Sequence, residues 1–155
     1  PEKLIPLVIS KCLSGNKIPV YGNGLQIRDW VHVSDHVDGI LFVLENGKIG
    51  SKYNIGSNNE VSNINLVKKL CEILDKVRPI DNGSFKDLIS FVSDRPGHDS
   101  RYALDTSKIN NLGWKPSVSW EEGLSDTVKW YLDNEDFLLK TASKKYTGER
   151  LGRIK

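Results

Sequence analysis

The chain alternates short segments rich in β-branched and aromatic residues with longer segments in which apolar residues recur every three or four positions. The first pattern is typical of strands, and the second of helices that pack one face on a core. A sequence that alternates the two is expected to fold as an α/β protein. Strands are predicted at residues 18–21, 26–33, 52–56, 88–92 and 101–105. Helices are predicted at residues 2–13, from Ser34 or Asp35 to Gly47, from Ser62 or Asn63 through Leu74, and from Asp105 through Asn111. A last helix of about 18 residues is predicted after the capping-box segment 119–122.

A glycine-rich turn separates the first two predicted strands. It consists of Gly22, Asn23 and Gly24, and an Asn-Gly pair tolerates the positive φ of a tight turn. The two strands are therefore predicted to pair as a β-hairpin that carries Arg28.

Length and composition describe one ordinary domain. A chain of 155 residues can bury a real core, and no apolar run approaches the roughly 20 residues of a membrane-spanning helix. The start lacks the features of a secretory signal and the sequence contains no Met, so we expect it to begin inside a longer protein. Cys12 and Cys71 fall on apolar helix faces and are predicted to be small buried thiols in a reducing, cytoplasmic compartment.

The positive charge is concentrated at the C-terminus. The net charge is +2, but residues 140–155 contain six Lys or Arg and a single Glu. This segment is predicted to be a flexible basic tail after a domain of residues 1–139. It contains one aromatic residue and no nucleic-acid-binding motif, so we expect neither a nucleic acid nor a membrane as partner.

The sequence contains no recognisable set of catalytic or metal-binding groups. A GxGxxG after a strand, a P-loop, a GxSxG, an HExxH and a Cys pair are all absent. The sequence predicts instead a distributed anion site, because guanidinium groups bind diphosphates through paired hydrogen bonds. The candidate residues are Arg28, Arg95, His98 and Arg101, with Gly24 and Gly97 allowing close backbone approach and Asn63 at a helix start that favours phosphate.

A simpler interpretation stays open at this point. Arg28 and Arg95 are each adjacent to an aspartate, Asp29 and Asp94, and two surface ion pairs of small energetic value would explain the same residues.

Several segments together resemble the C-terminal part of the dTDP-glucose 4,6-dehydratases, a family of extended short-chain dehydrogenases/reductases. They are PEKLIPL, PVYGNGLQIRDWVHVSDH, KYNIGSNNE, DRPGHDSRYALD and LGWKP, within residues 1 to about 137. The resemblance implies that this chain is a small mixed substrate-binding lobe without the Rossmann domain. It implies that the parent enzyme is an NAD-dependent lyase, often of rhamnose biosynthesis, that converts dTDP-glucose to dTDP-4-dehydro-6-deoxyglucose. It also implies that NAD is bound mainly by a missing N-terminal Rossmann domain, so this chain alone is expected to be inactive.

The resemblance also implies roles for individual residues. Arg28 and Arg95 would neutralise the diphosphate, and Asn63 would donate a hydrogen bond to the ligand. The remaining implied contacts are Lys3 and Leu4 on the nucleotide, Pro19, Val20 and Tyr21 along thymine and deoxyribose, and Asp94 and His98 in a loop that folds over the ligand.

Other functions remain open from sequence alone. A related epimerase, dehydratase or decarboxylase could act on a UDP- or GDP-sugar, and a non-catalytic binding module could engage an acidic partner through its basic tail. The apolar face of the helix around Ile40 and Leu44 is expected to pack on the missing domain or, when exposed, to drive self-association into a homo-oligomer.

Overall fold

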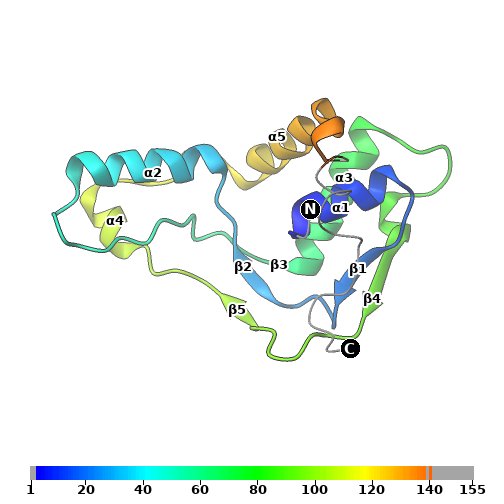
Figure 1. The fold of residues 1–155 in the computed structure, drawn as a ribbon, viewed down its shortest axis with the longest axis horizontal. Helices are drawn as coiled ribbons and strands as arrows, with labels where there is room; N and C mark the ends of the chain where they lie inside the picture. The colour runs from blue at the N-terminus through cyan, green and yellow to red at the C-terminus, as the bar shows by residue number, and fades with distance from the viewer. Residues whose placement is uncertain (1–2, 139, 141–155) are drawn as a thin grey trace.

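Helices and short strands alternate along the chain, as the sequence pattern predicts (Figure 1). A computed structural model describes residues 3–138 and residue 140; the predicted tail therefore lies, apart from Lys140, outside the described residues. The elements are α1 (Leu4–Leu13), β1 (Ile18–Tyr21), β2 (Ile27–Asp29), α2 (Val33–Asn46), β3 (Glu60–Ser62), α3 (Asn63–Val77), the 3-10 turn η1 (Phe85–Leu88), β4 (Ile89–Val92), β5 (Arg101–Tyr102), α4 (Ser107–Leu112) and α5 (Trp120–Asp133).

The strands form two small sheets, and the predicted hairpin is wrong. β1 pairs in parallel with β4, whereas β2 lies between antiparallel β3 and parallel β5. The reason lies in the hydrogen bonds of the glycine-rich turn. Gly24 N–H donates to Tyr21 O and closes the turn, but Gly24 O then accepts from Ile64 N–H at the start of α3. The turn is therefore hydrogen-bonded to the start of α3 and does not pair β1 with β2, which belongs to the other sheet.

The core lies between α1, α3, α5 and β1 (Figure 1). Val8 and Ile9 of α1 and Leu66 and Leu70 of α3 are fully buried, as expected for helices with one apolar face. Cys12 and Cys71 are free and buried in this core, which confirms the prediction of buried thiols. A hydrogen bond with Cys71, together with burial, raises the pKa of the Cys12 thiol above its ordinary value.

Two of the predicted helix caps are present. Ser62 and Ser119 occupy the N-cap positions of α3 and α5, and each hydroxyl accepts a backbone N–H three residues later. Asn63 is thus the first helical residue of α3 and not its cap. α5 has 14 residues, fewer than predicted.

The start of α2 differs from the prediction, because the N-cap position is His32 and not Ser34 or Asp35. Asp35 is only 3% exposed, and its carboxylate accepts hydrogen bonds from Ser117 N–H, Ser117 Oγ–H and Val118 N–H. Asp35 therefore holds α2 against the segment that leads into α5.

Two strand predictions are corrected. Residues 52–56 form no strand, and the strand predicted over 26–33 is reduced to Ile27–Asp29. The Asp29 carboxylate accepts hydrogen bonds from Ser57 N–H, Ser57 Oγ–H and Asn59 N–H. The Asp29 side chain therefore holds the segment that follows residue 56. Residues 52–56 form an irregular connection despite their strand-like composition.

The apolar face of α2 is exposed, and in Figure 1 α2 and α4 extend away from the core helices. The exposed fraction is half or more for Val37, Ile40, Leu41 and Leu44. The opposite side of α2 packs on Trp114, whose Nε1–H donates to Asp38 Oδ2 at 2.8 Å. Gly39 allows this contact, since a Cβ there would lie 2.8 Å from Ile55 Cγ2 and 3.1 Å from Trp114.

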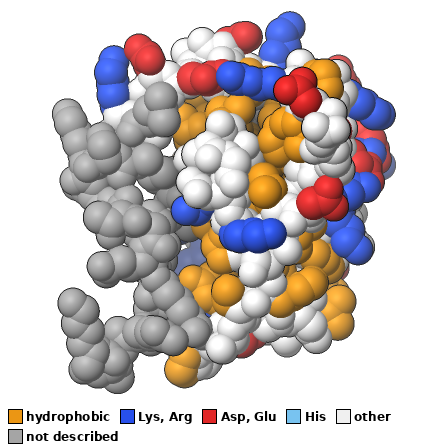
Figure 2. Space-filling view, turned by 90° about the vertical axis from the view of Figure 1, so that its right-hand side faces the viewer, with side chains coloured by type: hydrophobic (Ala, Val, Ile, Leu, Met, Phe, Trp, Pro, Cys, Tyr) orange, Lys and Arg blue, Asp and Glu red, His pale blue; other side chains and the backbone are white. Residues whose placement is uncertain are grey.

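The opposite end of the molecule, where β1 and β4 lie in Figure 1, carries charges of both signs (Figure 2). Hydrophobic side chains are visible there between Lys and Arg and Asp and Glu side chains. Phe91 of β4 is itself 59% exposed. Among the described residues visible on this face, charges of both signs are interspersed with hydrophobic side chains.

Candidate functional site

A cavity of about 620 Å³ lies where α1, β1, β2, α3 and the loop after β4 meet. Nine of the ten residues that the family resemblance singles out line it. They are Lys3, Leu4, Pro19, Val20, Tyr21, Arg28, Asn63, Arg95 and His98, and the other lining residues are Leu7, Asp29, Trp30 and Val67. The tenth residue, Asp94, binds His98 from behind the lining. The structure thus brings residues far apart in the sequence to one site.

Arg28 is held in the cavity wall by contacts other than an ion pair. Its guanidinium donates to Ile27 O at 2.6 Å and to Asp99 O at 3.0 Å, and it lies 5.0 Å from the centre of the Tyr102 ring. Asp29 instead accepts hydrogen bonds from Ser57 and Asn59. The alternative in which Arg28 and Asp29 form a surface ion pair is therefore wrong.

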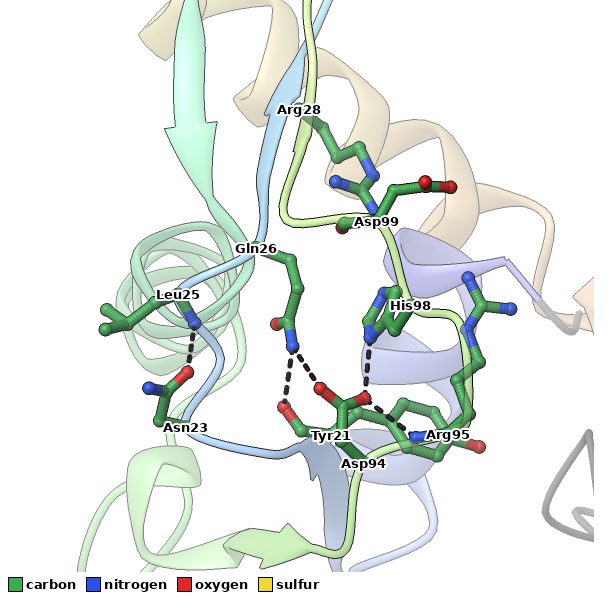
Figure 3. A network of polar contacts seen from close by, with 9 residues as sticks. All are labelled: Tyr21, Asn23, Leu25, Gln26, Arg28, Asp94, Arg95, His98 and Asp99. Atoms are coloured by element: carbon green, nitrogen blue, oxygen red, sulfur yellow. Dashed lines mark hydrogen bonds and ion pairs between the residues drawn. The ribbon is translucent and has the colours of Figure 1, made fainter.

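Asp94 organises the loop that carries the second arginine (Figure 3). Its Oδ1 accepts from His98 Nδ1–H at 2.7 Å and from the backbone N–H of Arg95 at 2.8 Å, while its Oδ2 accepts from Gln26 Nε2–H at 2.8 Å. The hydrogen bond from His98, followed by that from the Arg95 backbone, lowers the pKa of Asp94 below its ordinary value although desolvation opposes it. Asp94 is therefore a stable carboxylate acceptor at neutral pH.

Arg95 contributes to the lining of the cavity. Only the backbone N–H of Arg95 donates to Asp94. The Arg95 side chain forms no hydrogen bond or ion pair with any residue in 3–138 or with Lys140. The second proposed ion pair, between Arg95 and Asp94, is therefore wrong as well. Figure 3 shows Arg28 and Arg95 with His98 between them along one side of the view.

Two helices begin at the cavity. Lys3 precedes the first residue of α1, and Asn63 is the first residue of α3. Asn63 N–H donates to Gln26 O at 2.9 Å, so the backbone of Asn63 is fixed while its half-buried side chain lines the cavity. The positive ends of the helix dipoles add to the cationic side chains there.

The lining separates into a cationic part and an apolar part. Positive charge or N–H donors come from Lys3, Arg28, Arg95 and His98. The carboxylate of Asp29 accepts hydrogen bonds from the loop 57–59. Leu4, Leu7, Pro19, Val20, Tyr21, Trp30 and Val67 supply apolar and aromatic surface. The arrangement suits a ligand with an anionic group attached to a planar, less polar one.

Arg101 and Gly24 do not act as the anion-site prediction supposed. Arg101 forms a two-point ion pair with Glu60, with both N–O distances at 2.6 Å, and does not line the cavity. A Cβ at Gly24 would lie 2.8 Å from both Ile64 and Val20, so Gly24 serves close packing and a positive φ. Gly97 also has a positive φ, and no heavy atom would lie within 4 Å of a Cβ there.

The sequence did not single out Trp30, which lines the cavity, or Gln26, which donates to Asp94 from outside the lining. A single Gln after a turn matches no functional motif, and a Trp in a strand-like segment is typical of a core aromatic. Trp30 lines both the large cavity and a smaller neighbouring cavity of about 290 Å³, and its Nε1 is buried without a partner among the described residues.

The described residues contain no group of three or more His, Cys, Asp or Glu suited to a metal ion. Within the same part of the chain, every helix is too short or too polar to cross a membrane.

Comparison with known proteins identifies the family. A family model described as GDP-mannose 4,6 dehydratase matches residues 1–127. The dTDP-glucose 4,6-dehydratase of Xanthomonas campestris pv. campestris is 48% identical over 154 residues, which are 98% of this chain and 44% of that protein. That alignment extends beyond residue 137, where the recognisable resemblance ended.

Solved structures agree. The dTDP-glucose 4,6-dehydratase of Bacillus anthracis in complex with NAD has a TM-score of 0.77 and 43% identity, covering 88% of this chain and 41% of that one. The Streptomyces venezuelae enzyme with NAD and the thymidine nucleotide TYD bound has a TM-score of 0.77 and 41% identity, covering 88% and 40%. The chain thus spans less than half the length of the relatives it matches. It belongs to the family that the GDP-mannose 4,6 dehydratase model describes, and it is homologous to part of the dTDP-glucose 4,6-dehydratases.

Proposed function

We propose that this chain is the nucleotide-sugar-binding part of an NAD-dependent dTDP-glucose 4,6-dehydratase, and that the large cavity holds the dTDP portion of dTDP-glucose. The observation that carries this proposal is the convergence of Arg28 and Arg95 on one cavity, with His98 between them. Two guanidinium groups can neutralise a diphosphate and donate parallel hydrogen bonds to its oxygens.

The apolar part of the cavity fits the rest of a thymidine nucleotide. Pro19, Val20 and Tyr21 would line the base and the deoxyribose, Asn63 would donate a hydrogen bond, and Lys3 and Leu4 would contact the nucleotide from the start of α1. Asp94 would act indirectly, because its carboxylate orients His98 and the backbone of Arg95.

This chain would contribute to catalysis through binding. The parent enzyme would convert dTDP-glucose to dTDP-4-dehydro-6-deoxyglucose and water, and the sugar must then be placed accurately against the cofactor. Binding energy from the remote nucleotide can supply that placement. The cavity would therefore raise the rate without providing an acid, a base or a nucleophile.

NAD would oxidise and later reduce the sugar, and we propose that it is bound mainly outside this chain. Among the described residues no strand leads through a Gly-rich turn into a helix, the unit that holds a dinucleotide. We propose that a Rossmann domain supplies that unit and packs on the exposed apolar face of α2. The assembled protein would be cytoplasmic.

Nucleotide competition tests the proposal. Calorimetric titration of the 155-residue chain with dTDP, UDP and GDP should give the tightest binding for dTDP. Tighter binding of UDP or GDP would instead indicate an epimerase, dehydratase or decarboxylase of another nucleotide sugar. A chain that binds none of them, but loses an acidic partner when residues 140–155 are deleted, would indicate a binding module.

A further inference from the structure

Gln26 lies between the two parts of the chain that carry the candidate ligand contacts. Its side chain donates to Asp94, in the loop of Arg95 and His98, and its backbone carbonyl accepts from Asn63 at the start of α3. Gln26 is only 7% exposed and does not line the cavity. Gln26 therefore links Asp94, the residue that binds His98, to Asn63 in the cavity lining.

The orientation of the Gln26 amide follows from its neighbours. Nε2 lies 2.8 Å from Asp94 Oδ2 and 3.5 Å from Tyr21 O, and both of these atoms are acceptors. The NH₂ group must face them, which leaves Oε1 buried without a partner among the described residues. A buried polar atom without a partner costs free energy, so this orientation of the Gln26 amide reduces the stability that its hydrogen bond to Asp94 contributes.

The hydrogen bonds of Asp94 carry this constraint to the cavity. With Oδ2 held by Gln26, Oδ1 accepts from His98 Nδ1–H, and this fixes the imidazole with its proton on Nδ1. Gly22 completes the fit, because a Cβ there would lie 2.9 Å from Asp94 Oδ2. Asp94 thus accepts a hydrogen bond from Gln26, and Gly22 leaves room for its carboxylate where a side chain would clash.

We propose that Gln26 is a positioning residue of the nucleotide site: through Asp94 it sets the tautomer and place of His98 and the backbone of Arg95, and through its carbonyl it fixes Asn63. The inference rests on the proposed function for its consequence in binding. The orientation of His98 can be measured without any ligand.

The first test uses the free protein. Gln26 is the only glutamine in the sequence, so ¹⁵N-glutamine labelling gives one side-chain amide whose NMR signals report the hydrogen bond to Asp94. Histidine ¹⁵N shifts report which ring nitrogen of His98 carries the proton. In Gln26→Met, which keeps the size but removes the donor, we expect the Nδ1-protonated form of His98 to lose population. His98 signals identical to those of the unaltered protein would overturn the proposal.

The second test measures binding. Gln26→Met should weaken dTDP binding by about tenfold, the size expected for one hydrogen bond to a charged group. Asn111→Ala removes an exposed amide outside the cavity and should leave affinity unchanged. Equal affinity of Gln26→Met and the unaltered chain, with folding verified by thermal melting, would contradict the proposal. Failure of the unaltered chain to bind dTDP would refute the proposed function, while the NMR test would still decide the role of Gln26.

A pH series separates positioning from packing. The groups around the Gln26 side chain are Asp94, Arg95 and His98 of the loop, Tyr21 of β1 and, farther along β2, Arg28. Gln26→Glu places a second carboxylate beside Asp94, so its affinity relative to the unaltered chain should be lowest near pH 8. Near pH 5 the introduced carboxyl group can take up a proton and again donate to Asp94, and the deficit should shrink at least threefold. A deficit independent of pH would contradict the proposed hydrogen-bond role.

Discussion

The Arg28 guanidinium lies 5.0 Å from the centre of the Tyr102 ring, and the two residues face each other across the β2–β5 pair. Tyr102 therefore supports the cation from a neighbouring strand. An exposed cation–π contact is worth about 0.5–1 kcal/mol, so Tyr102→Leu should weaken dTDP binding by about two- to fivefold. Tyr102→Phe keeps the ring and should bind like the unaltered chain in calorimetry. Equal losses in both variants would contradict this support of Arg28.

Loss of either cavity arginine should weaken binding more strongly. Arg28→Ala and Arg95→Ala each remove charged hydrogen-bond donors to the proposed diphosphate, so affinity for dTDP should fall by about ten- to a hundredfold. Arg101→Ala is a matched control, since Arg101 pairs with Glu60 outside the cavity. Calorimetry showing unchanged affinity in both cavity variants would exclude the diphosphate assignment.

Asp35 should make stability depend on pH below about 5. Desolvation opposes the Asp35 carboxylate, but hydrogen bonds from Ser117 and Val118 prevail and lower its pKa below the ordinary value of 3.8. A lowered pKa in the folded state contributes stability above 3.8 that is lost as pH falls through the folded-state pKa. Asp35→Asn should reduce the free energy of unfolding by about 1–3 kcal/mol at pH 7.

The matching measurement is urea denaturation between pH 2 and 7. The gap in unfolding free energy between the unaltered chain and Asp35→Asn should narrow towards low pH, because both then lack the carboxylate. A gap that stays constant over this range would show that the ionised form contributes nothing.

The exposed face of α2 should cause self-association of the isolated chain. Ile40 and Leu44 are 50% and 79% exposed, and apolar patches of this kind are buried when a partner is present. Sedimentation velocity should show oligomers that grow with concentration and disappear in Ile40→Lys/Leu44→Lys. Glu45→Lys changes the net charge of the same helix by the same amount and should leave association intact. A clean monomer at all concentrations would refute this expectation.

The 155-residue chain should show no turnover with dTDP-glucose and NAD. Its cavity has cations and apolar surface, but the sequence contains no recognisable set of acid, base and nucleophile. Formation of the 4-keto sugar can be followed by chromatography, and any amount above that of a heat-denatured sample would contradict the prediction.

Local pattern predicted local structure well, and the pairing of strands poorly. The bounds of β1 and the caps Ser62 and Ser119 agree with propensity and capping rules. The hairpin failed because the turn at Gly24 is followed by backbone hydrogen bonds to α3, a contact across about forty residues that no local rule contains. In the same way, the segment 52–56 has the composition of a strand but pairs with no strand among the described residues.

The candidate site shows the same division. Arg28 and Arg95 could be selected as candidates from the chemistry of arginine. Only the fold distinguishes them from Arg101, which forms an ion pair with Glu60. Gln26 carries no signal in sequence, because its importance comes from Asp94, sixty-eight positions away.

The walls of the large cavity come from places between Lys3 and His98 in the chain. A ligand that contacts all of these walls would hold them together, because the ligand would have to dissociate before any one wall could open. Saturating dTDP should therefore slow proteolysis and amide exchange across most of this span together, by the mass-action factor that affinity sets, rather than near a single loop.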